Sequence, residues 1–213
     1  MENQTTASTE LQKKSERTRQ KIMNAYIRLM HEKDFLTIKV KTIVEEAQIT
    51  RGTFYLYFSD TSDLITQIEN QLLSGMPQMP PKTGTPIDLY LPPTFEVINN
   101  TSWEREWFRY YQANHQAFNA LLGPHGDRAF YRQIVRYLQD SISVNMKRDL
   151  MPEDDYQTYF LNLLPDIFLM ISKEWTGDAI YQDIDLDSIV SIISTIRAGS
   201  MYKRHLELHH NLR

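Results

Sequence analysis

Residues 49–60 of the chain, I-T-R-G-T-F-Y-L-Y-F-S-D, are too polar for a helix that is buried on all sides. In a helical conformation, Ile49, Phe54 and Phe58 form one narrow apolar face. The other side carries hydrogen-bonding groups, namely Thr50, Arg51, Thr53, Tyr55 and Tyr57. Such a helix packs on the protein along one side and offers polar groups to a partner along the other.

The preceding chain predicts two further helices. Apolar residues recur at helical spacing between about Glu16 and His31 and define one face of the first helix: Ile22, Tyr26, Leu29 and Met30. A short second helix is expected from Val40 to Ala47, with Ile43 and Val44 facing inward. Residues 1–14 are polar and lack periodicity, so they are expected to form a disordered tail.

Gln48 and Ile49 leave room only for a tight turn between the second helix and the third. Thr50 is a good N-cap for the third helix, because its hydroxyl can accept a hydrogen bond from an early backbone N–H. A fourth helix is expected after residue 60, with apolar residues at helical spacing: Leu64, Ile65, Ile68, Leu72 and Leu73. Two short helices around such a turn, the second polar on its outer face, are typical of a helix-turn-helix.

The side chains on the outer face of the third helix suit duplex DNA. Arg51 can donate to guanine O6 and N7 or to phosphate, and Thr50 and Thr53 carry both a hydroxyl and a methyl group. Gly52 allows the start of the helix to approach a DNA backbone closely. The rigid ring of a tyrosine can present its hydroxyl to phosphate, which applies to Tyr55 and Tyr57.

The distribution of charge favours the same partner. The whole chain of 213 residues carries a net charge of −4. Between Lys13 and Phe58, however, ten Lys and Arg residues face five Asp and Glu residues. From Gln71 onward, thirteen basic residues face seventeen acidic ones. The excess of positive charge marks the N-terminal part as the candidate for phosphate contact.

The rest of the chain is also helical by pattern, so the expected fold class is all-α. Six of the nine prolines fall in residues 74–102, which are expected to form a linker or excursion. Apolar stripes then recur over residues 103–122 and 130–142 and over two late segments, about 154–175 and 185–206. The expected domains are residues 15–73, the helix-turn-helix domain, and residues 103–213, a helical domain.

Several classes of protein are disfavoured. The chain has no cysteine, no apolar run of membrane-spanning length and no signal-peptide pattern, so a cytoplasmic protein that spans no membrane is expected. No H-E-x-x-H, G-x-S-x-G or phosphate-binding glycine loop is present, so we expect no enzyme. His205 and His209 have metal-binding spacing but lack suitable further ligands, so neither a metal nor another cofactor is expected.

Residues 51–58, R-G-T-F-Y-L-Y-F, resemble the signature of the TetR family of bacterial transcription regulators. The resemblance implies an N-terminal three-helix DNA-binding domain and a C-terminal helical domain for ligand binding and dimerisation. It also implies DNA contacts from the second, third and fourth helices, which here are Lys39, Lys41, Thr50, Arg51, Gly52, Thr53, Tyr55, Tyr57 and Thr61.

Three positions depart from the family pattern. Lys39 replaces the usual threonine N-cap of the second helix, and Gln48 replaces a glycine of the turn. Thr61 replaces a lysine that often grips phosphate at the start of the fourth helix. The missing charge can come from an N-terminal arm that carries Lys13, Lys14, Arg17 and Arg19.

The second half resembles the family less specifically. L-L-G-P-H-G-D-R-A-F, residues 121–130, is similar to the DhaS-like branch common in Gram-positive bacteria. The resemblance implies a homodimer formed by the last two helices and a cavity for an unknown small-molecule effector. Candidate cavity residues are Trp107, Tyr111, His115, Phe118 and Phe168, although such an aromatic stripe is more often packed core.

These observations predict a dimeric transcriptional regulator, a ligand-responsive repressor that binds a palindromic operator in double-stranded DNA. Two alternatives stay open at this point. The chain can be an activator, or a regulator controlled by a protein partner. It can also be a helical interaction module that binds no DNA, in which case Gln48 and Thr61 are signs of a decayed motif.

Overall fold

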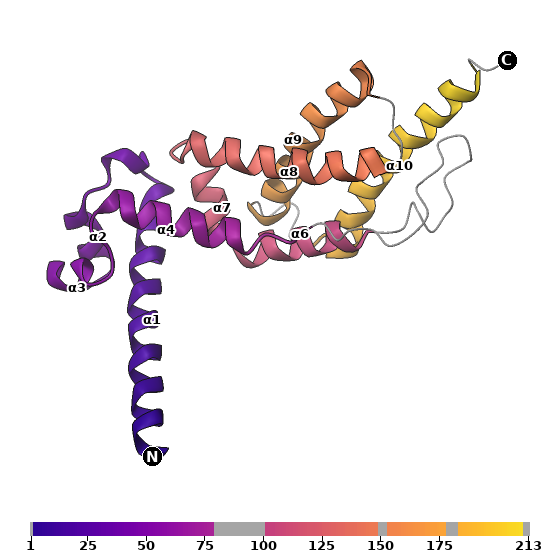
Figure 1. Ribbon diagram of the computed structural model, residues 1–213. Helices are drawn as coiled ribbons and strands as arrows, with labels where there is room; N and C mark the ends of the chain where they lie inside the picture. Colours follow the sequence, from indigo (N-terminus) through magenta and orange to yellow (C-terminus); the bar gives the residue numbers. More distant parts are fainter. Residues whose placement is uncertain (1, 79–100, 149–152, 178–182, 211–213) are drawn as a thin grey trace. The chain divides into compact units, whose positions relative to one another are not determined.

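The computed structural model describes residues 2–78, 101–148, 153–177 and 183–210 (Figure 1). All its regular elements in these ranges are helices, which confirms the predicted all-α class. The chain forms two compact units. Unit 1 comprises residues 1–74 and 116–131, and unit 2 comprises residues 75–115 and 132–213. Most of the proline-rich segment expected over 74–102 lies outside the described residues.

Unit 1 contains the predicted helix-turn-helix. Its elements are α1 (Glu2–Met30), the 3-10 helix η1 (Phe35–Thr37), α2 (Val40–Glu46), α3 (Arg51–Tyr55) and α4 (Thr61–Ser74). The apolar positions expected to face inward are buried in α1 and α2, where Ile22 and Ile43 have no exposed surface. Phe54 of α3 and Phe58 are likewise buried, with ring centroids 5.7 Å apart. The aromatic side of the polar stretch therefore anchors α3 to the domain.

Helix α1 begins much earlier than the sequence predicts. The expectation was a helix from about Glu16 preceded by a disordered tail, whereas α1 runs from Glu2. Residues 11–17 are all exposed, so no apolar face marks this part of the helix. Several of them are good helix formers, including Leu11, Lys13 and Arg17, which lets the helix continue without packing. A search for apolar periodicity cannot detect such an extension.

Unit 2 consists of α6 (Ser102–Ala113), most of α8 (Arg128–Arg148), α9 (Asp155–Gly177) and α10 (Leu186–His210). Helix α6 packs against both α9 and α10. Its buried indole Trp107 donates from Nε1 to Ser172 Oγ of α9 at 3.0 Å, and Arg105 forms an ion pair with Asp187 of α10. No helix in the described part of the chain is long and apolar enough to cross a membrane.

The aromatic stripe expected over residues 103–122 is divided between the two units. It forms two helices, α6 and α7 (His115–Leu121), which are separated at Asn114. The Asn114 side-chain amide donates to the carbonyl of Tyr110 at 2.9 Å, and its backbone N–H donates to the same oxygen at 3.2 Å. Residues 116–131 then belong to unit 1, where Phe118 lies against Phe130 with centroids 6.4 Å apart.

A backbone hydrogen bond joins this segment to the N-terminal helices. The N–H of Phe35 donates to the carbonyl of His125 at 3.1 Å. The turn that presents His125 needs a glycine at position 126, because a Cβ there would lie 2.0 Å from the carbonyl oxygen of Leu121. The N-terminal unit thus includes a segment that the predicted domain of residues 15–73 did not contain.

Candidate nucleic-acid interface

The turn between α2 and α3 has the geometry of a glycine C-cap, although it contains no glycine. Gln48 adopts a left-handed conformation with φ of 49°. The N–H of Gln48 donates to Glu45 O at 3.1 Å, and that of Ile49 donates to Val44 O at 3.0 Å. These two bonds form a Schellman motif with Gln48 in the position that glycine usually fills. The departure from the family pattern therefore keeps the turn and adds backbone strain.

Thr50 is the N-cap of α3, as predicted. Its Oγ1 accepts from the N–H of Thr53 at 3.1 Å, and the two threonine hydroxyl oxygens are 2.9 Å apart. This pairing orients both hydroxyl groups at the first turn of the helix. By contrast, Lys39 at the start of α2 makes no side-chain cap. The nearby Thr37 does not cap α2 either, because its Oγ1 donates to Asp34 O.

The outward face of α3 is open to solvent. Arg51 and Gly52 are exposed, Tyr55 has 57% of its surface exposed, and Leu56 has 81%. Neither Arg51 nor Tyr55 has an ion pair or side-chain hydrogen bond among the described contacts. The exposed side chains of α3 and of its C-cap Leu56 are therefore available to a partner.

Gly52 has no packing role within the protein. A Cβ built at this position would meet only Thr50 Oγ1, at the ordinary contact distance of 3.7 Å. Its backbone is helical and does not need the conformational freedom of glycine. Because glycine destabilises a helix interior by roughly 0.5–1 kcal/mol relative to alanine, folding alone gives no reason for it. The missing side chain leaves the backbone open to close approach at this position.

The predicted contacts from α2 and α4 differ in their surroundings. Lys39 and Lys41 are exposed, and Lys41 Nζ lies 4.0 Å from Glu45 Oε1, a weak surface pair. Thr61 and Tyr57 are half-buried. The predicted DNA-contact residues of α2, of α3 and of the start of α4 all lie in the same compact unit.

The start of α4 is capped by two aspartates that the sequence analysis did not single out. Asp60 Oδ1 accepts from the N–H of Asp63 at 2.8 Å, and Asp63 Oδ2 accepts from the N–H of Ser59 at 2.8 Å. Hydrogen bonds from the Gln67 amide and then from Ser59 hold the pKa of Asp63 below its usual range. The S-D-T-S-D pattern, with carboxylates three residues apart, is the sequence signal for this reciprocal cap.

Arg19 is held within the protein, unlike the other basic residues proposed for an N-terminal arm. Its Nη2 donates to Gln67 Oε1 of α4 at 2.9 Å, and Nη1 lies 3.5 Å from Glu16. Its guanidinium carbon lies 5.9 Å from the centroid of the Phe58 ring. Arg19 thus connects α1 to Gln67 of α4 and to Phe58, which follows α3 in the chain.

The five candidate cavity residues do not form one group. Trp107, Tyr111 and Phe168 lie in unit 2 and are buried, with the rings of Trp107 and Tyr111 6.1 Å apart. They belong to an aromatic cluster that also includes Trp103, Phe108, Tyr137 and Trp175. Burial raises the pKa of Tyr111.

The other two cavity candidates have different surroundings. Phe118 is buried in unit 1 against Phe130. His115 is half-exposed, and its Nδ1 is 2.8 Å from the carbonyl oxygen of Gln112. The side chains of His205 and His209 lie outside the described part of the structure.

A carboxyl pair lies where α4 approaches the 116–131 segment. Glu69 Oε1 is buried and has no hydrogen-bond partner among the described atoms. Burial, followed by the charge and a hydrogen bond of Asp127, raises the pKa of Glu69 from 4.5 to about 7. Tyr26 of α1 lies near the same two carboxyl groups, and burial and then their charges raise its pKa. No local pattern in the sequence pointed to this cluster.

A capped, exposed, polar recognition helix on a tight turn defines unit 1 as a helix-turn-helix of a DNA-binding regulator. Residues 22–68 match the family described as bacterial regulatory proteins, tetR family. This match confirms the predicted resemblance to the tetR family over the N-terminal helix-turn-helix unit. The family consists of regulators, in agreement with the expectation that the chain is not an enzyme. No curated protein matches this chain.

Solved structures share the fold at low sequence identity. The fatty acid degradation regulator FadR from Bacillus halodurans has a TM-score of 0.58 and 14% identity, over 85% of this chain and 95% of its own. A TetR transcriptional regulator from Streptococcus agalactiae 2603V has a TM-score of 0.56 and 17% identity, over 89% and 98%. These likenesses show a common fold for almost the whole chain.

A third solved structure concerns the predicted branch. The dihydroxyacetone kinase operon activator DhaS has 18% identity and a TM-score of 0.48, over 86% of this chain and 96% of its own. A TM-score this low does not decide the branch to which the chain belongs. The resemblance to the DhaS-like branch therefore stays a prediction.

Proposed function

We propose that the protein is a homodimeric transcriptional repressor that binds a palindromic operator and releases it when a small molecule binds. The observation that carries the DNA-binding part is the outer face of α3. There, Arg51 and Tyr55 are exposed and form no ion pair or side-chain hydrogen bond with the described residues, and Gly52 has no packing role. DNA as the partner implies a cytoplasmic protein.

The first turn of α3 is suited to groove contact. Thr50 and Thr53 fix each other, so their hydroxyl and methyl groups are presented in one arrangement. Arg51 can reach a guanine edge or a phosphate, and the absent side chain of Gly52 lets the backbone come close. Lys39 and Lys41 at the start of α2, and Tyr57 and Thr61 toward α4, are proposed as backbone contacts. They give register rather than base specificity.

The dimer is supported by an unpartnered apolar face on α9. Tyr159, Leu163 and Met170 have 70%, 59% and 57% of their surfaces exposed. They are spaced by four and seven residues, which places them on one side of the helix. Ile192 of α10 adds a further exposed apolar side chain, at 44%. A second copy of the chain is the proposed occupant of this face, since a two-fold dimer matches a palindromic operator.

The proposed effector is a small molecule. A small molecule changes DNA affinity only if it binds the DNA-competent and incompetent states differently. Unit 2, with its aromatic cluster around Trp107 and Tyr111, is the proposed effector domain. His115 and Phe168, which also belong to unit 2, remain candidates for the effector site, to be tested by substitution.

The test is selection of operators from random duplex DNA by the purified protein. It is repeated with Arg51→Ala and with the matched control Arg132→Ala, an exposed arginine of α8 in unit 2. We expect a palindromic consensus that Arg132→Ala retains and Arg51→Ala weakens or relaxes at one position. If the wild-type protein selects no sequence even at low salt, the chain is a helical interaction module and the proposal is wrong. A non-palindromic consensus would contradict the two-fold dimer alone.

A further inference from the structure

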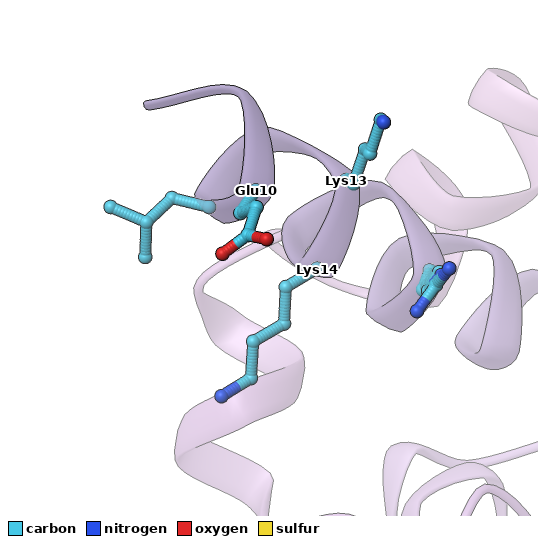
Figure 2. A pocket seen from close by; sticks show the side chains of 5 residues that line it. Glu10, Lys13 and Lys14 are labelled. Carbon is cyan, nitrogen blue, oxygen red and sulfur yellow. The ribbon is translucent and has the colours of Figure 1, made fainter. Parts of the chain in front are cut away.

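The part of α1 that projects from unit 1 carries free positive charge. Lys13, Lys14 and Arg17 are exposed, and none of them has an ion-pair partner among the described residues. They line a surface hollow together with Glu10 and Leu11 (Figure 2). The side chains of Lys13 and Lys14 leave the helix in different directions (Figure 2). The nearby Glu16 pairs with Arg19 at 3.5 Å, and Glu10 is the one carboxylate that lines the hollow with the three cations.

These cations follow the axis of the helix. Lys13, Arg17 and the exposed Lys21 are spaced by four residues each and therefore lie on one side of α1. With a rise of 1.5 Å per residue, they span about 12 Å along the axis. Duplex DNA carries one negative charge for about every 1.7 Å of its axis, so a stripe of this length can face several phosphates.

The base of this projecting helix lies beside the elements proposed to contact DNA. Arg19 contacts Gln67 and Phe58, and the residues of α1 before it, 10–17, are exposed. Phe58 directly follows Tyr57 in the chain. Gln67, which accepts the hydrogen bond from Arg19, lies on α4, and this helix begins at Thr61. From residue 17 back to Glu10 every side chain is exposed, and α1 extends beyond α2, α3 and α4 (Figure 1). The projecting segment thus starts where α1 contacts α4 and the residue that follows Tyr57.

We propose that the N-terminal extension of α1 is a second DNA-binding element. Through Lys13, Lys14 and Arg17 it binds the phosphate backbone of the duplex flanking the half-site that α3 contacts. The proposal rests on the proposed DNA-binding function. Lys13 and Lys14 act as point charges, and the proposed partner of Arg17 is also a phosphate, so the proposed contact is independent of sequence. It supplies the charge that Thr61 lacks at the start of α4.

The test compares a triple variant, Lys13→Gln, Lys14→Gln and Arg17→Gln, with a control of the same charge change. The control is Arg132→Gln, Arg136→Gln and Lys173→Gln, three exposed residues of unit 2. Binding to the operator selected by the wild-type protein is measured over a range of salt concentrations. Two duplexes are used: the minimal operator, and one extended by about 10 base pairs, one helical turn, on each side. Circular dichroism checks that all variants keep their helices.

We expect the triple variant to bind the extended operator more weakly while the control does not. The slope of log K against log salt should fall by about 0.9 for each lost phosphate contact, up to about 5 for two protomers. Trimming the flanks should weaken the wild-type protein but leave the triple variant unchanged. An unchanged salt slope with normal operator binding overturns the inference and leaves the proposed function intact. If the wild-type protein binds no DNA, the proposed function fails and this inference fails with it.

Discussion

The carboxyl pair between α4 and the 116–131 segment makes the stability of unit 1 depend on pH in a predictable direction. Glu69 has a pKa of about 7 in the folded protein, against 4.5 ordinarily, because it is buried beside Asp127. The folded state therefore binds the proton more tightly than the unfolded state does. The resulting stabilisation is fully present below pH 4.5 and is lost as the pH rises through 7.

Glu69→Gln removes this titration while keeping a side chain that can donate to Asp127. At 1.36 kcal/mol per pKa unit, the rise from 4.5 to about 7 corresponds to at most about 3.4 kcal/mol. Because Glu69 is only half-buried, solvent screening reduces the expected effect to about 1–2 kcal/mol. Relative to the wild type, Glu69→Gln should gain this free energy of unfolding between pH 5 and pH 8.

The assay is urea unfolding at several pH values, with all proteins at one concentration because the proposed dimer would make the stability depend on concentration. Glu32→Gln, at an exposed position of unit 1 just after α1, is the matched control and should show no pH-dependent difference. Asp127→Asn keeps an oxygen to accept from the N–H of Ala129 but removes the negative charge. It should move the transition toward lower pH. A difference between Glu69→Gln and wild type that is constant from pH 5 to pH 8 would refute the reasoning.

Three further predictions concern single positions. Gly52→Ala should raise the free energy of unfolding by up to about 1 kcal/mol in a urea titration, yet weaken operator binding; normal DNA binding would show that no close approach occurs there. Gln48→Gly should stabilise the protein by about 1 kcal/mol by relieving the left-handed backbone, and a lower urea midpoint would contradict this. Leu163→Glu should shift the protein toward monomer in analytical ultracentrifugation, because it introduces two charges into the proposed two-fold interface. The exposed Glu174→Gln serves as its control, and an unchanged dimer would exclude this face of α9.

The helix-turn-helix could be predicted because its signals are local. Helix α2 begins at the predicted Val40 and ends one residue before the predicted Ala47, and Thr50 caps α3 as expected. Apolar spacing fixed which side of each helix is buried, and the excess of positive charge marked the part of the chain proposed to meet DNA. In these helices, the apolar spacing and the Thr50 cap favour the same structure.

Other features had no local signal. The extension of α1 has no apolar face, so the length of the helix depends on propensity alone. The division between α6 and α7 occurs at Asn114, inside an aromatic stripe that is continuous in the sequence. The pairing of Glu69 with Asp127, like the bond from Phe35 to His125, joins residues far apart in the chain. Only tertiary structure brings such groups together.

The placement of residues 116–131 in unit 1 has a consequence for the modular use of this protein. A fragment cut after Ser74 would lack the carbonyl that accepts from the Phe35 N–H and the segment that covers Tyr26 and Glu69. The unit that holds the helix-turn-helix therefore includes residues 116–131 and is not contained in an N-terminal fragment alone. A chimera that joins it to a foreign effector domain would need an equivalent of the 123–127 turn. During synthesis, the chain must also be made as far as residue 131 before all parts of unit 1 are present.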